Sequence, residues 1–202
     1  MPLSPSLRFF LTATALCAAA NASTVFNFDS DNLGTTTTFT NTVNGVSATF
    51  SSSADPGGFV VYQSIFETLT GNVLGDPGPA GMDSLALSVN FSANLAAVEL
   101  DFATSDFSTP SPLTLTAYEN SKLIGSVSTT GQFLSGFSFP EGEIAFAGSP
   151  FNRIVISSTA SDFAVDNIAV SAAPEPATCA LLGTALLALG VPALRRRRAA
   201  IR

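Results

Sequence analysis

Alternation of apolar and polar residues dominates the sequence between residues 23 and 173, and it restricts this part of the chain to one fold class. In Ser84–Ser92 every second residue is apolar: Leu85, Leu87, Val89 and Phe91. Successive side chains of a strand point to opposite faces of a sheet, so this spacing places one apolar face against a core. No segment of comparable length has helical periodicity. The pattern predicts an all-β fold, an antiparallel β-sandwich or jelly roll.

The segments that fit this strand pattern are separated by turns rich in glycine and proline. They are Thr24–Asp29, Thr35–Thr42, Val46–Ser52, Phe59–Gln63, Ser84–Ser92, Ala96–Ala103, Leu113–Glu119, Leu123–Ser128, Glu143–Ala147, Arg153–Ser158 and Phe163–Val170. The short link Ser92–Asn94 predicts that the segments on either side of it form an antiparallel hairpin. Ser64–Thr70 is ambiguous and is a candidate loop.

The N-terminus has the features of an export signal. Arg8 precedes the apolar stretch Phe9–Ala20, which is too short to span a bilayer. Ala20 and Ala22 then form a small-x-small cleavage site. We expect residues 1–22 to be a cleavable signal peptide that uses the Sec export machinery, and residues 23–173 to be the exported domain.

The C-terminus combines a short motif, an apolar segment and a basic cluster. The motif consists of Pro174, Glu175 and Pro176, and its prolines favour extended backbone that a processing enzyme could bind. Residues 177–194 carry no charge and would span about 27 Å as a helix, close to the roughly 30 Å hydrocarbon core of a bilayer. A stop-transfer cluster follows, made of Arg195, Arg196, Arg197 and Arg198. The sequence predicts one C-terminal transmembrane helix over 177–194 with its arginines in the cytoplasm.

The order and spacing of these three features resemble the sorting signal of PEP-CTERM proteins of Gram-negative bacteria. The resemblance covers residues 174–202. It implies processing by an exosortase-like membrane enzyme, transient anchoring in the inner membrane, and a final location at the cell surface or in the extracellular matrix. It also implies exopolysaccharide as a partner. Tails of this kind sometimes carry an ice-binding label.

Charge and residue types exclude several functions for residues 23–173. Fourteen acids and only two bases, Lys122 and Arg153, give this segment a net charge of −12, which excludes nucleic acid as a partner. The chain has no histidine, and both cysteines, Cys17 and Cys179, lie outside the segment. Catalysis that needs His or Cys is therefore excluded within it, and Lys122 is expected in a solvated hairpin turn. We predict a non-catalytic structural or adhesive role.

Asp29 and Asp166 are the candidate calcium ligands. Each interrupts an apolar-rich strand near one end of the domain, and calcium prefers carboxylate and backbone oxygens. The segments Phe26–Asp29 and Phe163–Ile168 resemble the terminal strands of exported jelly-roll domains, including carbohydrate-binding modules. That resemblance implies that the two strands lie side by side and can share a structural calcium ion. In the alternative interpretation Asp29 begins a loop, and Asp166 caps a bulge or bonds a neighbouring turn.

A carbohydrate-binding jelly-roll module with a structural calcium is the alternative function. Tyr118 is expected to point outward and could stack on a sugar, although the chain has no tryptophan and its 17 phenylalanines are interpreted as core. A carboxylate-based glycoside hydrolase is less favoured, because Glu99 and Asp101 fit a solvated strand edge. Ice binding by Thr35–Thr38 is also less favoured, since only alternate threonines of a strand share a face.

Overall fold

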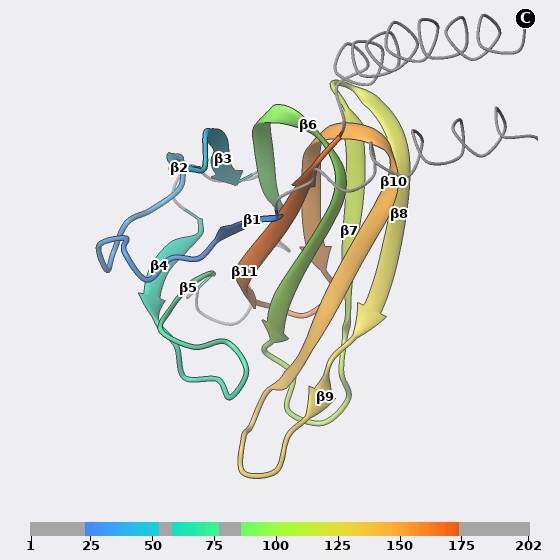
Figure 1. Cartoon of the computed structure of the whole chain (residues 1–202). Helices are drawn as coiled ribbons and strands as arrows, with labels where there is room; N and C mark the ends of the chain where they lie inside the picture. The colour runs from blue at the N-terminus through green and yellow to red at the C-terminus, as the bar shows by residue number, and fades with distance from the viewer. Residues whose placement is uncertain (1–22, 53–57, 77–85, 174–202) are drawn as a thin grey trace, which may run out of the picture. The chain divides into compact units, whose positions relative to one another are not determined.

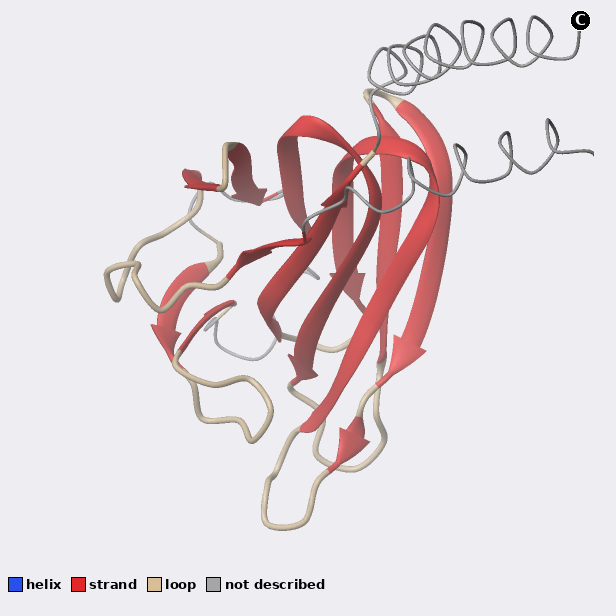
Figure 2. Ribbon diagram, viewed as in Figure 1, coloured by secondary structure: helices blue, strands red, loops and turns tan. Residues whose placement is uncertain are grey.

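The structure is a computed structural model of the whole chain, and it describes residues 23–52, 58–76 and 86–173. The predicted signal peptide, the Pro-Glu-Pro motif and the predicted membrane helix lie outside these residues. All regular structure in the described residues is β-strand (Figure 2). None of these residues forms a helix that could cross a membrane. The prediction of an all-β, antiparallel fold is confirmed.

The strands follow the predicted segments closely, with additions. They are β1 (Ser23–Phe26), β2 (Phe39–Val43), β3 (Val46–Ser52), β4 (Val60–Gln63), β5 (Asn72–Gly75), β6 (Ala86–Thr104), β7 (Pro112–Glu119), β8 (Lys122–Thr130), β9 (Gln132–Phe133), β10 (Pro140–Ser158) and β11 (Phe163–Ala172). The sequence did not predict β5 or β9. The segment Thr35–Thr42 was predicted as one strand, but β2 begins only at Phe39. The threonines before it bond instead to the chain near β4, with the Thr37 N–H donating to Phe59 O at 2.9 Å.

Two long strands, β6 and β10, lie next to each other and belong to both layers of the fold. Residues 86–91 of β6 pair with β3 and with the C-terminal half of β10. Residues 95–104 pair with β11 and with the N-terminal half of β10. Register shifts in β10 between Ala147 and Arg153 mark the bend. Figure 1 shows both strands folding over together at one end of the domain.

The predicted hairpin around Ser92–Asn94 is therefore wrong. The two halves of β6 do not pair with each other, because this link continues the strand around a corner instead of reversing it within one sheet. The predicted segments Glu143–Ala147 and Arg153–Ser158 are likewise two halves of β10.

The two layers are assembled on these shared strands. One layer has the order β2-β3-β6-β10-β7-β8, and the other has β4-β5-β11-β6-β10, with β9 pairing to β10. The first and last strands lie side by side, since β1 pairs antiparallel with β11 from Ser23↔Ser171 to Phe26↔Ile168. This pairing agrees with the expectation for the terminal strands.

Apolar residues from both layers meet in one core. Phe50 of β3, Leu87 and Phe102 of the two halves of β6, and Ile154 of β10 are all fully buried. The Phe50 ring lies 5.4 Å from Phe28 and 5.0 Å from Phe39 between ring centroids. Burial of this apolar surface is the main stabilising contribution to the fold.

A smaller apolar cluster lies on the other face of the layer that contains β11. Leu69, Val73, Ala103 and Ala164 are buried there, with the half-buried rings of Tyr62 and Phe66 packed against them. Ala103 of β6 and Ala164 of β11 are partners in adjacent strands. Leu69 belongs to the same cluster and lies between β4 and β5, so this part of the chain covers the outer face of the layer at the end of β6. This covering segment forms one wall of the candidate site.

Candidate functional site

A hollow of about 260 Å³ opens where the end of β6 and the start of β11 meet the segment between β4 and β5. Its polar groups come from Tyr62, Asp76, Thr104, Ser105 and Asp162. Its apolar lining comes from Ile65, Phe66, Ala103, Phe139, Phe163 and Ala164. Aromatic rings beside a few convergent polar groups are typical of sites that bind small molecules.

Tyr62 lines the hollow from β4, and its position depends on a glycine. A Cβ atom on Gly75 would lie 2.8 Å from the Tyr62 hydroxyl and 3.0 Å from the Cβ of Ala164. Gly75 pairs with Val60 on one side and with Ala164 on the other, so its backbone is fixed between two strands. The absence of a side chain on Gly75 therefore leaves the space that the tyrosine hydroxyl occupies.

Two carboxylates, Asp76 and Asp162, give the hollow a negative charge. The pKa of Asp162 is raised, first by burial and then by the charge of Asp76, while bonds from Ser161 and Ser105 partly oppose the rise. Burial, with the charges of Asp162 and Asp76, raises the pKa of Tyr62 to about 12. The tyrosine is therefore a neutral hydroxyl donor at ordinary pH.

Three phenylalanines continue from the hollow to the surface. The Phe66 and Phe139 rings meet edge to face at 5.7 Å between centroids, and Phe139 meets Phe107 at 5.4 Å. Phe107 is 78% exposed, the most exposed of the large apolar side chains in the described residues. Exposing an aromatic ring to water is unfavourable, so a row of rings that leads outward indicates a binding surface.

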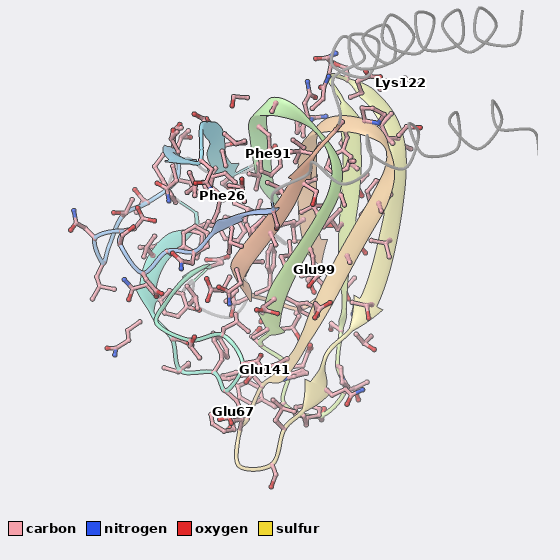
Figure 3. The ribbon with its side chains drawn as sticks, in the orientation of Figure 1. Phe26, Glu67, Phe91, Glu99, Lys122 and Glu141 are labelled. Atoms are coloured by element: carbon pink, nitrogen blue, oxygen red, sulfur yellow. The ribbon has the colours of Figure 1, made fainter. Side chains whose placement is uncertain are left out.

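Glu141 fixes the segment that carries Phe66. The Glu67 N–H donates to Glu141 Oε1 at 2.9 Å, and the Thr68 N–H and hydroxyl both donate to Oε2 at 2.6 Å. Glu141 is 3% exposed at the start of β10, and it lies close to Glu67 at the same end of the domain (Figure 3). Bonds to a charged acceptor are stronger than neutral ones, and this contact ties the segment to the sheet.

Asp106 fixes the loop that carries Phe107 through hydrogen bonds to its carboxylate. Its Oδ2 accepts bonds from the Thr104 hydroxyl at 2.9 Å and the Ser111 N–H at 2.8 Å. Its Oδ1 accepts a bond from the Ser111 hydroxyl at 2.9 Å. Hydrogen bonds to buried or half-buried carboxylates thus fix the segments that carry Phe66 and Phe107, which would lower the entropic cost of binding a ligand.

Sequence reasoning did not find this site. Phe66, Phe107 and Phe139 were counted as core, whereas in the structure they line or extend the hollow. One signal was present: none of the three fits the alternation of a neighbouring strand, and Phe107 and Phe139 stand among Ser and Pro. A phenylalanine outside any strand pattern is a candidate surface ring.

Asp166 feels the charge of Asp29 and stands in an unusual environment. It is 1% exposed, and neither of its carboxylate oxygens has a hydrogen-bond partner among the described residues. Its pKa is raised to about 7, and burial is the largest cause. The charges of Asp29 and Asp101 also raise the pKa, while the nearby N–H of Asn167 lowers it without forming a well-directed bond. Asp166 is paired in register with Asp101, beside a bulge at which Asn167 has φ 50°.

Asp29 has a structural partner of its own. Its Oδ1 accepts a bond from the Asn72 N–H at 2.9 Å, and a Cβ atom on Gly71 would overlap this carboxylate. No group of three or more His, Cys, Asp or Glu side chains in residues 23–52, 58–76 and 86–173 is arranged to hold a metal ion. The residues therefore fit a cation only in part: Asp166 offers unpartnered oxygens, and further ligands would have to include backbone or water oxygens.

The other predicted residues do not converge on the hollow. Tyr118 is half-buried on β7 and is covered by the Arg153 guanidinium, 4.4 Å from the ring centroid. Glu99 and Asp101 are in β6, in the middle of a layer and not at an edge. The Glu143 carboxyl beside them has a raised pKa, mainly because of the charge of Glu99. Lys122 is exposed at the β7–β8 turn, as expected.

No protein-family model matches this sequence, and no curated protein is similar to it. The fold is similar to that of the K2 cleaved adhesin domain of Lys-gingipain, with a TM-score of 0.50 and 13% identity over 74% of this chain and 99% of that domain. The K1 adhesin domain of Lys-gingipain from Porphyromonas gingivalis W83 has a TM-score of 0.47 at 8% identity, covering 75% and 99%. A family 29 carbohydrate-binding module has a TM-score of 0.37 at 12% identity, covering 75% and 92%. The first similarity establishes a shared fold and nothing about ligands.

Proposed function

We propose that residues 23–173 form a non-catalytic adhesive module that binds carbohydrate in the hollow beside Tyr62. The observation that carries the proposal is the row of rings, Phe66, Phe139 and Phe107, that leads from a hollow with carboxylates to the surface. The shared fold with an adhesin domain is consistent with this role. Sugars present C–H faces to aromatic rings and hydroxyl groups to carboxylates, so both kinds of group are needed.

Binding to a panel of soluble oligosaccharides and exopolysaccharides tests the proposal. In the variants Phe139→Ala and Phe107→Ala we expect affinity to fall about tenfold or more, since losing about 1.4 kcal/mol of ring contact has that effect. Tyr118→Ala is the matched control, because this ring lies against Arg153, outside the hollow. Equal affinity in all four proteins, or binding lost only with Tyr118→Ala, would place the carbohydrate elsewhere.

A carboxylate-based glycoside hydrolase is the second candidate, because Asp76 and Asp162 share the hollow and the pKa of Asp162 is raised. A hydrolase would release reducing ends from the polysaccharide that the protein binds, and Asp162→Asn would abolish the release. A binding module retains its ligand intact over the same period.

We also propose that Asp166 takes part in a calcium site, because a buried carboxylate with no hydrogen-bond partner in the described part of the chain is stabilised by a cation. Calcium would supply structural cross-linking between the terminal strands and would take no part in sugar binding by the hollow. Thermal unfolding in calcium and in chelator tests this proposal: we expect a higher midpoint with calcium, and no such gain in Asp166→Asn. An unchanged midpoint in the wild-type protein would contradict it.

The sorting proposal concerns the ends of the chain. We propose export after cleavage at Ala22, transient anchoring through residues 177–194, and processing at the Pro-Glu-Pro motif by an exosortase-like enzyme. The support is the order of motif, apolar segment and arginines, and it is independent of the hollow. Intact mass of the protein recovered from its host tests the proposal, and retention of residues 177–202 in surface material would contradict processing.

A further inference from the structure

We infer that the outer face of the layer β2-β3-β6-β10-β7-β8 is a second binding site, which takes polysaccharide that carries uronate carboxylates and holds the carboxylate at Arg153. The inference goes beyond the proposed function, because none of the residues that form this face lines the hollow. It is supported by the rows of hydroxyl groups on the face, by the position of both bases of the domain, and by an unsatisfied guanidinium.

Uncharged polar side chains occupy most outward positions of this layer. Inward residues of the same strands, such as Phe50, Val89 and Ile154, are buried in the core, so the residues between them point outward. The strand register aligns the outward residues in two rows, which together we call the hydroxyl face: Thr40, Thr49, Asn90, Arg153 and Tyr118 in one row, and Ser51, Ser88, Val155, Thr116 and Ser126 in the next. At about 4.8 Å between neighbouring strands, the first row is roughly 19 Å long from β2 to β7, enough for several sugar units.

Hydrogen bonds within the rows hold the hydroxyl groups in place. Thr40 Oγ1 and Thr49 Oγ1 lie 2.8 Å apart, and Thr116 Oγ1 and Ser126 Oγ lie 3.1 Å apart. Each hydroxyl has capacity for further hydrogen bonds after making one. The face therefore presents ordered groups that can bond to the hydroxyls of a sugar chain.

Positive charge gathers at one end of the hydroxyl face. Residues 23–173 have a net charge of −12, yet neither row contains an acid. Both bases of this segment lie at the same end: Arg153 is the register partner of Tyr118, and Lys122 is the register partner of Glu119, the next residue of β7. An anionic group is therefore attracted to this end more than to any other part of the segment.

The turn that carries Lys122 is tied to the strand that carries Arg153. The Asn120 N–H donates to Asn152 Oδ1 at 2.8 Å, and Asn152 Nδ2 donates to Asn120 Oδ1 at 3.1 Å. These two bonds fix the distance between the bases.

The Arg153 guanidinium is held in place but is not satisfied. It lies over the Tyr118 ring, 4.4 Å from the ring centroid. Its Nε atom is buried and has no hydrogen-bond partner in the described part of the chain. A buried N–H of a charged group without an acceptor is unfavourable. A carboxylate matches the two parallel N–H groups on one edge of a guanidinium, and it would supply the missing acceptor after a small shift of the side chain.

A uronate unit combines the two kinds of group that the hydroxyl face can bind, a planar carboxylate and several hydroxyls. The net charge of the domain opposes an anion only at long range, because salt screens charges beyond about 8 Å at physiological ionic strength. Nucleic acid carries a charge for about every 1.7 Å of helix and meets this repulsion along its whole length. A polysaccharide with separated carboxylates can place one of them at Arg153 and neutral units along the rows.

A hexasaccharide of alternating glucuronic acid and N-acetylglucosamine tests the inference, in comparison with the same oligosaccharide after methyl esterification of its carboxyls. The sugar backbone is shared and only the charge differs. By calorimetry in about 0.15 M salt we expect the full chain to bind the acid at least about tenfold more tightly than the ester. Arg153→Gln should abolish this preference, and Arg153→Lys should retain only part of it, because an ammonium group lacks the paired N–H geometry. Lys122→Gln should reduce the preference less, and Phe139→Ala, in the hollow, should retain it in full.

The outcomes separate this site from the hollow. Equal binding of acid and ester by the wild-type protein would overturn the inference, and so would a preference for the acid that survives Arg153→Gln. Loss of the preference in Phe139→Ala would assign the carboxylate to the hollow and would also overturn it. The proposed function is tested separately, by the response of neutral sugars to Phe139→Ala. Tyr118→Ala should weaken binding of the acid, since it removes the ring beneath Arg153, so this variant serves as a control for the hollow with neutral sugars.

Discussion

Replacing Asp166 by asparagine is the most informative perturbation of this fold. The carboxyl group is 1% exposed in β11 and has no hydrogen-bond partner among the described residues, so its charge is disfavoured in the folded state. Asparagine has nearly the same shape and no charge. The substitution therefore removes the cost of ionisation and changes the packing very little.

The size of the effect depends on pH. The pKa of Asp166 rises from 3.8 to about 7 on folding, mainly through burial, which corresponds to about 4 kcal/mol of unfavourable free energy for the ionised form. Below about pH 4 the group is protonated in both the folded and the unfolded protein, and it has no effect. Between about pH 4 and 7 only the unfolded chain releases the proton, so stability is lost as the pH rises. Above pH 7 the loss is complete.

Urea unfolding of the wild-type protein and Asp166→Asn at pH 5 and pH 8, with chelator present, measures this difference. At pH 8 we expect the variant to be more stable by about 2–4 kcal/mol, equivalent to a melting temperature higher by on the order of 10 °C. At pH 5 the gain should be much smaller. Glu119→Gln is the control for the loss of one charge away from Asp166, at the half-buried end of β7, and its stability should change by less than about 0.5 kcal/mol.

Two results would refute this reasoning. Equal stability of variant and wild type at pH 8 would mean that Asp166 is solvated or paired in solution. A wild-type stability that rises between pH 5 and pH 8, and rises less in the variant, would mean that the folded state favours the ionised carboxylate.

Three further perturbations probe the site and the core. Glu141→Ala removes three hydrogen bonds to Glu67 and Thr68, and it should lower the free energy of unfolding in urea by about 2–4 kcal/mol. An unchanged midpoint would show that this carboxylate does not hold the segment. Gly75→Ala should displace the Tyr62 hydroxyl and weaken oligosaccharide binding in calorimetry, and wild-type affinity would show that the tyrosine is not needed there. Phe50→Ala should lower the unfolding free energy by about 3–5 kcal/mol, because the ring is fully buried between Phe28 and Phe39. A loss below about 1 kcal/mol would contradict the close packing of this cluster.

The strands could be predicted because burial imposes a period of two on them. Val46–Ser52 has the predicted bounds, and the other long strands lie within a few residues of theirs. The strand β5, Asn72–Gly75, was missed because its four residues, which follow Gly71 and end in a glycine, show no alternation. The corner in β6 was taken for a hairpin because Ser, Ala and Asn are common in turns, and only the pairing partners on each side distinguish the two.

The candidate site was less predictable for a related reason. The sequence alone does not distinguish a phenylalanine in the core from one at the rim of a site. The difference depends on how loops that are distant in the sequence pack together. Asp166 stood out in the sequence because a carboxylate interrupts an apolar strand, yet its lack of partners depends on the chain that covers it. Glu141 showed no signal, since its role depends on the N–H groups of residues 67 and 68, more than seventy positions earlier.

The direction of β11 sets the distance between the aromatic rim and the C-terminal end of the described domain. The strand begins at Phe163 in the wall of the hollow and ends at Ala172, after which the Ala173 N–H donates to Asn94 O at the corner of β6. Nine residue steps of about 3.3 Å separate the two points, so Ala173 lies roughly 30 Å from the wall of the hollow. A ligand bound at the aromatic rim would therefore lie about one strand length away from Ala173.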